Sequence, residues 1–166
     1  MDQTTKLAWL GIIAAAPVGR LATRRADGAV DLVPFVFAHV PGPGPYGRLV
    51  SGVDHKPKRT TELTRFVNVA GAPAVTVLVD HYDDDWSTLW WVRLRGLAHR
   101  CELDSERTEV LAALVAKYEQ YVHSPPAGPL LVITINQILA WSATGSLPGV
   151  TNAAGSAVLR GGETSR

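Results

Sequence analysis

Three cations cluster just ahead of a predicted helix in the run Lys56-Pro57-Lys58-Arg59. Pro57 excludes a helix through this run, because it lacks a backbone donor and restricts the preceding residue to extended angles. The threonines at positions 60 and 61 can cap the helix that follows. Free backbone N–H groups at such a helix start favour an anion, and nearby cations strengthen that preference. The pattern therefore indicates a phosphate site, with a solvated basic loop as the alternative interpretation.

The composition is that of a soluble globular chain with one domain. Of its 166 residues, 46% are hydrophobic and 19% are charged, which is enough apolar material for a proper core. The formal net charge is +1, so no overall charge attracts nucleic acid or a membrane surface. Any anion site must therefore be local, as it is in the basic run.

The single cysteine, Cys101, excludes an intramolecular disulfide and is typical of a reducing compartment. No apolar run approaches the roughly 20 residues of a membrane-spanning helix. The first residues lack the basic-then-apolar order of a secretion signal. These features predict a cytoplasmic protein, in which Cys101 is a packed thiol rather than a nucleophile.

Hydrophobic periodicity and turn residues predict a mainly β chain with helices between its strands. Pro34 falls inside the second predicted strand and indicates a sheet edge or a bulge there. Apolar residues on both faces of that strand predict that it is covered on both sides. The expected architecture is a small antiparallel barrel with helices outside it. The predicted strands are 18–25, 29–40, 49–53, 74–82, a long strand within 86–102, and 130–142, and the predicted helices are 4–16, 60–68 and 104–122.

The last part of the chain differs in composition from the rest. From Gly145 onwards it is rich in Gly, Ala, Ser and Thr and has few large apolar side chains. Such a segment has little apolar surface to offset the entropy lost on ordering. We expect one barrel domain over residues 1–144 and a flexible tail over residues 145–166.

Two adjacent tryptophans, Trp90 and Trp91, point to opposite faces of the long strand, because side chains alternate along a strand. One of them should pack in the core, and the other shares its face with Arg93 and Arg95. A Trp beside two Arg residues suits a flat anionic ligand. It also suits a dimer surface, where Trp and Arg are enriched.

The acidic run Asp83-Asp84-Asp85 follows His81 closely and looks at first like a metal cluster. Its spacing matches no standard ligand pattern, so we predict no metal site and interpret the run as a turn with solvated carboxylates. No glycine-rich dinucleotide motif follows a strand, and the chain has no P-loop. The usual nucleotide fingerprints are therefore absent from the sequence.

Three stretches of the chain resemble the pyridoxamine 5′-phosphate oxidase-like split β-barrel superfamily. They are GRLATRRADGAVDLVPFVFA, RLVSGVDHKPKRTTEL and VTVLVDHYDDDWSTLWWVRLRGLAH, and the resemblance covers about residues 5–143. The runs KPKR and LVDHYDDDWSTLWWVR carry its specificity. The closest resemblance is to the actinobacterial branch that uses the deazaflavin coenzyme F420 in place of FMN. It implies a six-stranded antiparallel Greek-key barrel that forms a homodimer, with the cofactor in a groove between the subunits.

The resemblance also implies roles for individual residues. Lys58 resembles the phosphate-binding lysine of the superfamily, the second predicted strand would face the cofactor ring through its backbone, and the long strand would lie near the groove. The chain lacks the C-terminal substrate-binding segment of true pyridoxamine phosphate oxidases, so pyridoxal phosphate synthesis is not the expected activity. The residues that the resemblance assigns to the cofactor are Lys56, Lys58, Arg59, Thr60, Val33, Pro34, Phe35, Val36, Trp91 and Arg93.

These observations predict an oxidoreductase that transfers hydride between coenzyme F420 and an electron-poor small molecule. The cofactor supplies the chemistry, and the protein binds, orients and shields it. Two alternatives stay open: an FMN-dependent oxidase or reductase on the same fold, and a non-enzymatic protein that binds a flavin, a deazaflavin or a tetrapyrrole. The sequence does not identify the substrate.

Overall fold

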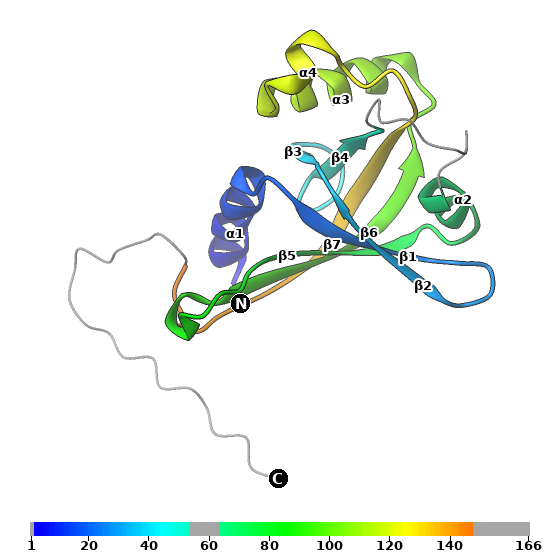
Figure 1. Cartoon of the computed structure of the whole chain (residues 1–166). Helices are drawn as coiled ribbons and strands as arrows, with labels where there is room; N and C mark the ends of the chain where they lie inside the picture. The colour runs from blue at the N-terminus through cyan, green and yellow to red at the C-terminus, as the bar shows by residue number, and fades with distance from the viewer. Residues whose placement is uncertain (1, 54–63, 148–166) are drawn as a thin grey trace.

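The computed structural model describes residues 2–53 and 64–147 of the chain (Figure 1). These residues form one antiparallel sheet with helices around it. The strands are β1 (Gly19–Arg24), β2 (Val30–Phe35), β3 (Ala38–Val40), β4 (Arg48–Gly52), β5 (Ala74–His81), β6 (Trp90–Arg100) and β7 (Leu130–Ser142). The helices are α1 (Gln3–Ala15), α2 (Thr64–Gly71), α3 (Asp104–Lys117) and α4 (Gln120–His123), with a short 3-10 helix, η1 (Trp86–Thr88). None of the described helices is long and apolar enough to cross a membrane.

The described part of the sheet has seven strands rather than the expected six, in the order β2-β1-β5-β6-β7-β4-β3. β2 and β3 lie at opposite edges of the sheet, yet only Val36 and Phe37 separate them along the chain. Such a connection spans roughly 10 Å at most. The two edges must therefore lie close together, and the sheet curls into a half-barrel (Figure 1).

The additional strand arises because the predicted strand over 29–40 breaks at Phe37. The hydroxyl of Tyr118 accepts a hydrogen bond from the Phe37 N–H at 3.0 Å and lies 2.7 Å from the Phe37 carbonyl oxygen. A side chain thus takes both backbone groups that a neighbouring strand would use. Tyr118 is free to do so because α3 ends at Lys117 and Tyr118 is extended, with φ −119° and ψ 112°. The predicted helix over 104–122 is accordingly two helices, α3 and α4.

The prediction for Pro34 is confirmed, because β2 is an edge strand and Pro34 lies opposite Arg20 of β1. This strand was also predicted to be covered on both faces, and for the first half of β2 that prediction is wrong. Phe35 is buried, but Leu32 is 65% exposed and Val33 is 39% exposed. The described chain therefore leaves apolar side chains of β2 in contact with solvent.

The β6–β7 pair contains an irregularity that helps the sheet to curl. Arg95 pairs with Gln137, whereas Gly96 pairs with Ile135, so the register shifts between Arg95 and Gly96. A Cβ atom at Gly96 would collide with the carbonyl oxygen of Thr134. Glycine is therefore required here by the close approach of the two backbones.

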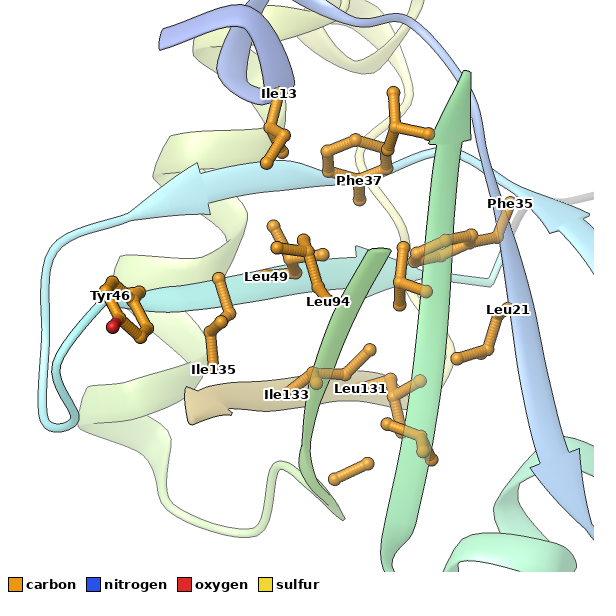
Figure 2. Packing of buried hydrophobic residues seen from close by; sticks show 14 of the residues in the cluster. Ile13, Leu21, Phe35, Phe37, Tyr46, Leu49, Leu94, Leu131, Ile133 and Ile135 are labelled. Atoms are coloured by element: carbon orange, nitrogen blue, oxygen red, sulfur yellow. The ribbon is translucent and has the colours of Figure 1, made fainter. Parts of the chain in front are cut away.

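The interior of the curled sheet is filled by one large apolar cluster (Figure 2). Leu21, Leu49, Leu94 and Ile135 come from four different strands, and each is at most 2% exposed. Ile13 of α1 packs onto the same cluster, so α1 closes one end of the half-barrel (Figure 2). Burial of these side chains is the main favourable term that holds the strands in a curl.

A second apolar cluster fixes α3 to the outside of the sheet. Val110, Leu114 and Tyr118, which are spaced four residues apart, are buried in it. They pack with Val50 of β4 and Val132 of β7. The apolar stripe of α3 thus holds the helix against the sheet, together with Tyr118 directly after it.

Lys117 joins the end of α3 to the end of α1. Its Nζ donates a hydrogen bond to the Ala16 carbonyl oxygen at 2.7 Å and lies 4.4 Å from the centre of the Phe37 ring. The ring favours the charged ammonium. Burial disfavours it more strongly and lowers the pKa of Lys117 to about 8.

We expect Lys117 to make the protein more stable as the pH rises above about 8. The folded chain releases this proton near pH 8, whereas the unfolded chain holds it to about 10.5, so the destabilising buried charge disappears across that window. Urea unfolding at about pH 7 and pH 9.5 of wild type and Lys117→Met measures this effect. The wild type should show the larger rise, and the alkaline titrations of Cys101 and Tyr118 affect both chains alike. An equal change in both chains would contradict the assignment.

Candidate functional site

The predicted phosphate residues Lys56, Lys58, Arg59 and Thr60 lie outside the described residues, but both ends of their segment are fixed. β4 ends at Gly52 and α2 begins at Thr64. Nη2 of Arg65 donates a hydrogen bond to the Gly52 carbonyl oxygen at 3.2 Å. The segment therefore starts and returns at the same corner of the sheet.

Helix α2, which begins at this corner, packs against β1 and β6 (Figure 1). Nδ2 of Asn68 donates hydrogen bonds to Thr23 Oγ1 at 3.0 Å and to Asp31 Oδ2 at 2.8 Å. Asn68 is only 6% exposed, and Phe66 and Val69 on the same helix are buried. A buried amide with both N–H groups satisfied fixes a helix firmly. Sequence patterns did not identify Asn68 as a structural residue. Its only signal was a single asparagine within the apolar stripe of a predicted helix.

The predicted cofactor residues Val33, Pro34, Phe35 and Val36 lie in different surroundings in the described chain. Phe35 points into the core and stacks on Phe37, with ring centres 5.2 Å apart. Pro34 lies opposite Arg20, and Val36 packs against the cluster under α3. The edge of β2 that faces away from β1 has no strand partner among the described residues. The backbone N–H and C=O groups along this edge are therefore not used by a neighbouring described strand.

Trp91 and Arg93 do lie together, in an open pocket of about 400 Å³ that we call the Trp91 pocket. The Arg93 guanidinium lies 5.8 Å from the centre of the Trp91 ring, a distance at which a cation is attracted to an aromatic face. Trp90 points the other way and packs beside Trp9 in the core, with ring centres 6.0 Å apart. The predicted division of the two tryptophans is confirmed. The lining residues of the pocket are Leu78, Asp80, Tyr82, Trp91 and Arg93.

One chain does not bring β2 and the Trp91 pocket together. Neighbouring strands pair Pro34 with Arg20, Arg20 with Leu78, and Leu78 with Arg93. Pro34 and Arg93 are therefore about three strand spacings, roughly 14 Å, apart along the sheet. The corner where β4 ends and α2 begins is farther away still. Helix α2 meets β6 at Arg100, whose guanidinium lies 6.0 Å from the Phe66 ring. Arg93 and Arg100 are roughly 23 Å apart along the strand.

The outward face of the sheet carries large apolar side chains that the described helices leave uncovered. Trp141 lies opposite Trp91, and Leu139 lies opposite Arg93. Both are 43% exposed, and Val30 and Leu32 of β2 are 64% and 65% exposed. Exposed apolar patches of this kind mark interaction surfaces. We call this surface the outer sheet face and define it by Val30, Leu32, Leu97, Leu139 and Trp141.

The acidic run forms the predicted turn. Asp83 Oδ1 accepts a hydrogen bond from the Asp85 N–H at 2.9 Å, and Asp85 Oδ1 accepts one from the Ser87 N–H at 3.0 Å. The hydroxyl and N–H of Ser87 lower the pKa of Asp85. The carboxylates therefore order the β5–β6 connection.

Cys101 is a packed thiol, as predicted, and is only 8% exposed. Burial and the neighbouring Glu106 raise the pKa of its thiol, which disfavours the nucleophilic thiolate. The same Glu106 pairs with the buried Arg48 at 3.3 Å, and Arg48 also pairs with Glu109 at 2.6 Å. No sequence pattern indicated this ion-pair cluster, which ties α3 to β4.

No protein-family model and no curated protein matches this chain, but solved structures do. The conserved hypothetical protein Rv2991 of Mycobacterium tuberculosis matches with a TM-score of 0.65 at 18% identity, over 95% of each chain. A pyridoxamine 5′-phosphate oxidase candidate from Listeria innocua matches with a TM-score of 0.57 at 19% identity, over 83% of this chain and 96% of that one. An FAD-binding protein from Mycobacterium smegmatis matches with a TM-score of 0.52 at 16% identity, over 82% of this chain and 92% of that one. The chain therefore has the pyridoxamine 5′-phosphate oxidase-like split-barrel fold.

Proposed function

We propose that this protein is an oxidoreductase that binds the deazaflavin coenzyme F420 and transfers hydride between it and an electron-poor small molecule. The observation that carries the proposal is the corner between β4 and α2, where Arg65 contacts Gly52 and where Asn68 of α2 contacts Asp31 of the edge strand β2. The names of similar structures include an FAD-binding protein and a pyridoxamine phosphate oxidase candidate, which supports a flavin-type cofactor. FMN is the alternative cofactor, because its phosphate would suit the same cations.

Each part of the chain has a defined task in this proposal. Lys56, Lys58 and Arg59 neutralise the cofactor phosphate, with Thr60 beside them, and the edge backbone of Val33–Val36 holds the ring. The bound cofactor supplies the hydride chemistry. The protein contributes position and exclusion of water, and solvent water provides the proton that completes reduction of the substrate. We also place the protein in the cytoplasm, in keeping with its single cysteine.

We further propose that the site is completed by a second copy of the chain. One chain holds Trp91 and Arg93 far from β2 and from the corner where β4 ends and α2 begins, so we expect a groove that uses all of these parts to need two subunits. The outer sheet face supplies the apolar surface for such a contact. A stable dimer buries about 800 Å² on each partner, and apolar residues spread over β2, β6 and β7 can contribute to that area.

The protein is therefore expected to be a homodimer, with twice the chain mass of 17.8 kDa. Light scattering at about 10 µM measures this directly, because a dimer with a Kd below about 1 µM is mostly associated at that concentration. Leu139→Lys places a charge on the outer sheet face and should shift the population to monomer. Val122→Lys is the matched control, because Val122 is 56% exposed on α4. A monomeric wild type would contradict both the dimer and the shared groove.

Titration of the purified protein with F420 and with FMN, side by side, tests the cofactor assignment. We expect F420 to bind with the higher affinity, measured by calorimetry or by cofactor fluorescence. Oxidation of reduced F420 by a panel of quinones and nitroaromatic compounds then tests hydride transfer. Tighter binding of FMN would favour the FMN-dependent alternative, and binding of neither cofactor would contradict the proposal.

A further inference from the structure

The strand residues that line the Trp91 pocket share the outward face of the sheet. Leu78 of β5 lies opposite Arg93 of β6, and Asp80 lies opposite Trp91. Val92, between Trp91 and Arg93, is fully buried, so its two neighbours point outward. Cross-strand neighbours on one face lie about 5 Å apart. One small ligand can therefore contact all four lining side chains at once.

Aromatic and apolar side chains surround this pocket. Tyr82, directly after β5, also lines it and is 62% exposed. On the far side of β6, Trp141 lies opposite Trp91 and Leu139 lies opposite Arg93. With a volume of about 400 Å³, the pocket is at the lower end of the range for small-molecule sites. These surroundings favour a flat ring system of modest size.

Arg93 brings a positive charge to the pocket that no described carboxylate neutralises. Asp80 already has a cationic partner, because Arg20 Nη1 lies 2.6 Å from Asp80 Oδ1. Arg93 has no ion-pair partner in the described part of the chain, and its guanidinium lies over the Trp91 ring. Two arginines and one aspartate leave one positive charge in excess. A partly buried guanidinium in this position favours a ligand that carries one negative charge.

Arg95, the next outward arginine of β6, is in a different situation. It does not line the pocket. Its side chain is exposed, and its Nη1 lies 3.5 Å from Gln137 Oε1. Water screens the charge of an exposed guanidinium, so Arg95 has less need of a bound anion. An experiment can therefore separate the two arginines of this strand.

We propose that the Trp91 pocket binds the substrate, and that this substrate is a planar aromatic molecule with one carboxylate. The assignment rests on the proposed function, which requires a substrate but does not identify it. The ring lies among the side chains of Leu78, Tyr82 and Trp91. Its carboxylate pairs with the Arg93 guanidinium, whose planar fork matches two carboxylate oxygens. A neutral analogue leaves Arg93 without an anion and should bind more weakly.

4-Nitrobenzoate is the probe for this pocket, and 4-nitrobenzamide, which has the same ring without the charge, is its matched control. Protein NMR without cofactor follows the indole N–H signals, and the Trp91 signal is the one that Trp91→Phe lacks. We expect 4-nitrobenzoate to shift this signal with a Kd on the order of 1 mM. The amide should bind about five- to ten-fold more weakly, because it loses the charge-assisted pair. Equal affinity for the two probes, or a shift of the Trp90 signal alone, would overturn the proposal.

Two matched variants identify the cation that the carboxylate meets. Arg93→Gln should abolish the preference, so that the two probes bind with similar affinity. Arg95→Gln removes the same charge two positions along the strand and should keep the preference of the wild type. An equal loss in both variants would show a response to the general charge of this face and would overturn the role of Arg93. If Arg93→Gln does not fold, Arg93→Lys takes its place and should reduce the preference, because lysine lacks the planar fork.

Turnover with reduced F420 separates this inference from the proposed function. The nitro group takes a hydride from the reduced cofactor and one proton from water, one N–O bond breaks, and the oxygen leaves as water to give the nitroso compound. We expect KM for 4-nitrobenzoate to be about five- to ten-fold below KM for 4-nitrobenzamide. Equal KM values would overturn the substrate assignment while F420-dependent reduction stands. Failure to bind F420 would contradict the proposed function and with it the substrate role, whereas the NMR titration would still decide whether the pocket takes an aromatic carboxylate.

Discussion

Replacing Lys58 with alanine is expected to weaken binding of the flavin-type cofactor by roughly ten- to hundred-fold. In the proposed site this side chain faces the cofactor phosphate at a helix start, where a charge-assisted hydrogen bond contributes on the order of 1.5–3 kcal/mol. Lys56→Ala and Arg59→Ala should have smaller effects, because each shares the phosphate with the others. Calorimetric titration with F420 and with FMN measures these losses.

The control for Lys58→Ala must remove one positive charge without touching the site. Lys6 is unsuitable, because its Nζ donates to the Tyr46 hydroxyl at 3.0 Å. Arg25 is a better control, because it lies in the β1–β2 turn and its side chain is 49% exposed. Its ion pairs with Asp27 and Asp31 lie at the surface. Surface ion pairs contribute only about 0–1 kcal/mol to stability. The difference between Lys58→Ala and Arg25→Ala should shrink at high salt. Equal affinity of Lys58→Ala and wild type would refute the phosphate assignment.

Sequence patterns predicted the elements whose signals are local. The strand predicted over 130–142 is β7, Leu130–Ser142, and the helix predicted over 4–16 is α1, Gln3–Ala15. Each is a long periodic segment with clear breakers at its ends, such as Pro17 after α1 and the proline-rich loop before β7. Alternation along β6 also predicted correctly that Trp90 and Trp91 point to opposite faces.

The strand order could not be predicted from these patterns, and the geometry of the candidate site depends on it. β1 is followed by β2 in the chain but also pairs with β5, and β4 pairs with β7. These long-range pairings separate Pro34 from Arg93 by two intervening strands. The family resemblance implied that both residues contact the cofactor, but only the strand pairing shows that they lie about three strand spacings apart in one chain.

The break between β2 and β3 was also beyond local prediction, because a distant side chain causes it. The segment over 29–40 is apolar and rich in strand-forming residues, so its pattern favours one continuous strand. Tyr118 lies 81 positions away from Phe37 in the sequence. Its hydroxyl replaces a strand partner at Phe37, and no pattern within either segment indicates that contact.

Tyr118→Phe is therefore expected to destabilise the fold far more than the loss of one surface hydroxyl would. The hydroxyl contacts the Phe37 N–H, the Phe37 carbonyl oxygen at 2.7 Å and the Pro17 carbonyl oxygen at 2.9 Å. Without it, the buried Phe37 N–H loses its partner, at a cost on the order of 2–3 kcal/mol. For a domain of this size that corresponds to a fall in Tm of roughly 5–10 °C.

Thermal unfolding of Tyr118→Phe beside Tyr82→Phe tests this expectation. Tyr82 is 62% exposed, so removal of its hydroxyl should change Tm by less than about 2 °C. Because Tyr118 holds Phe37 directly after the segment Val33–Val36, the variant should also bind the cofactor more weakly at temperatures where it is fully folded, by about threefold or more. A Tm within 2 °C of wild type would show that β2 and β3 separate for another reason. A large fall in Tm with unchanged affinity would instead place the cofactor away from β2, and the role of that strand in the proposed site would have to be abandoned.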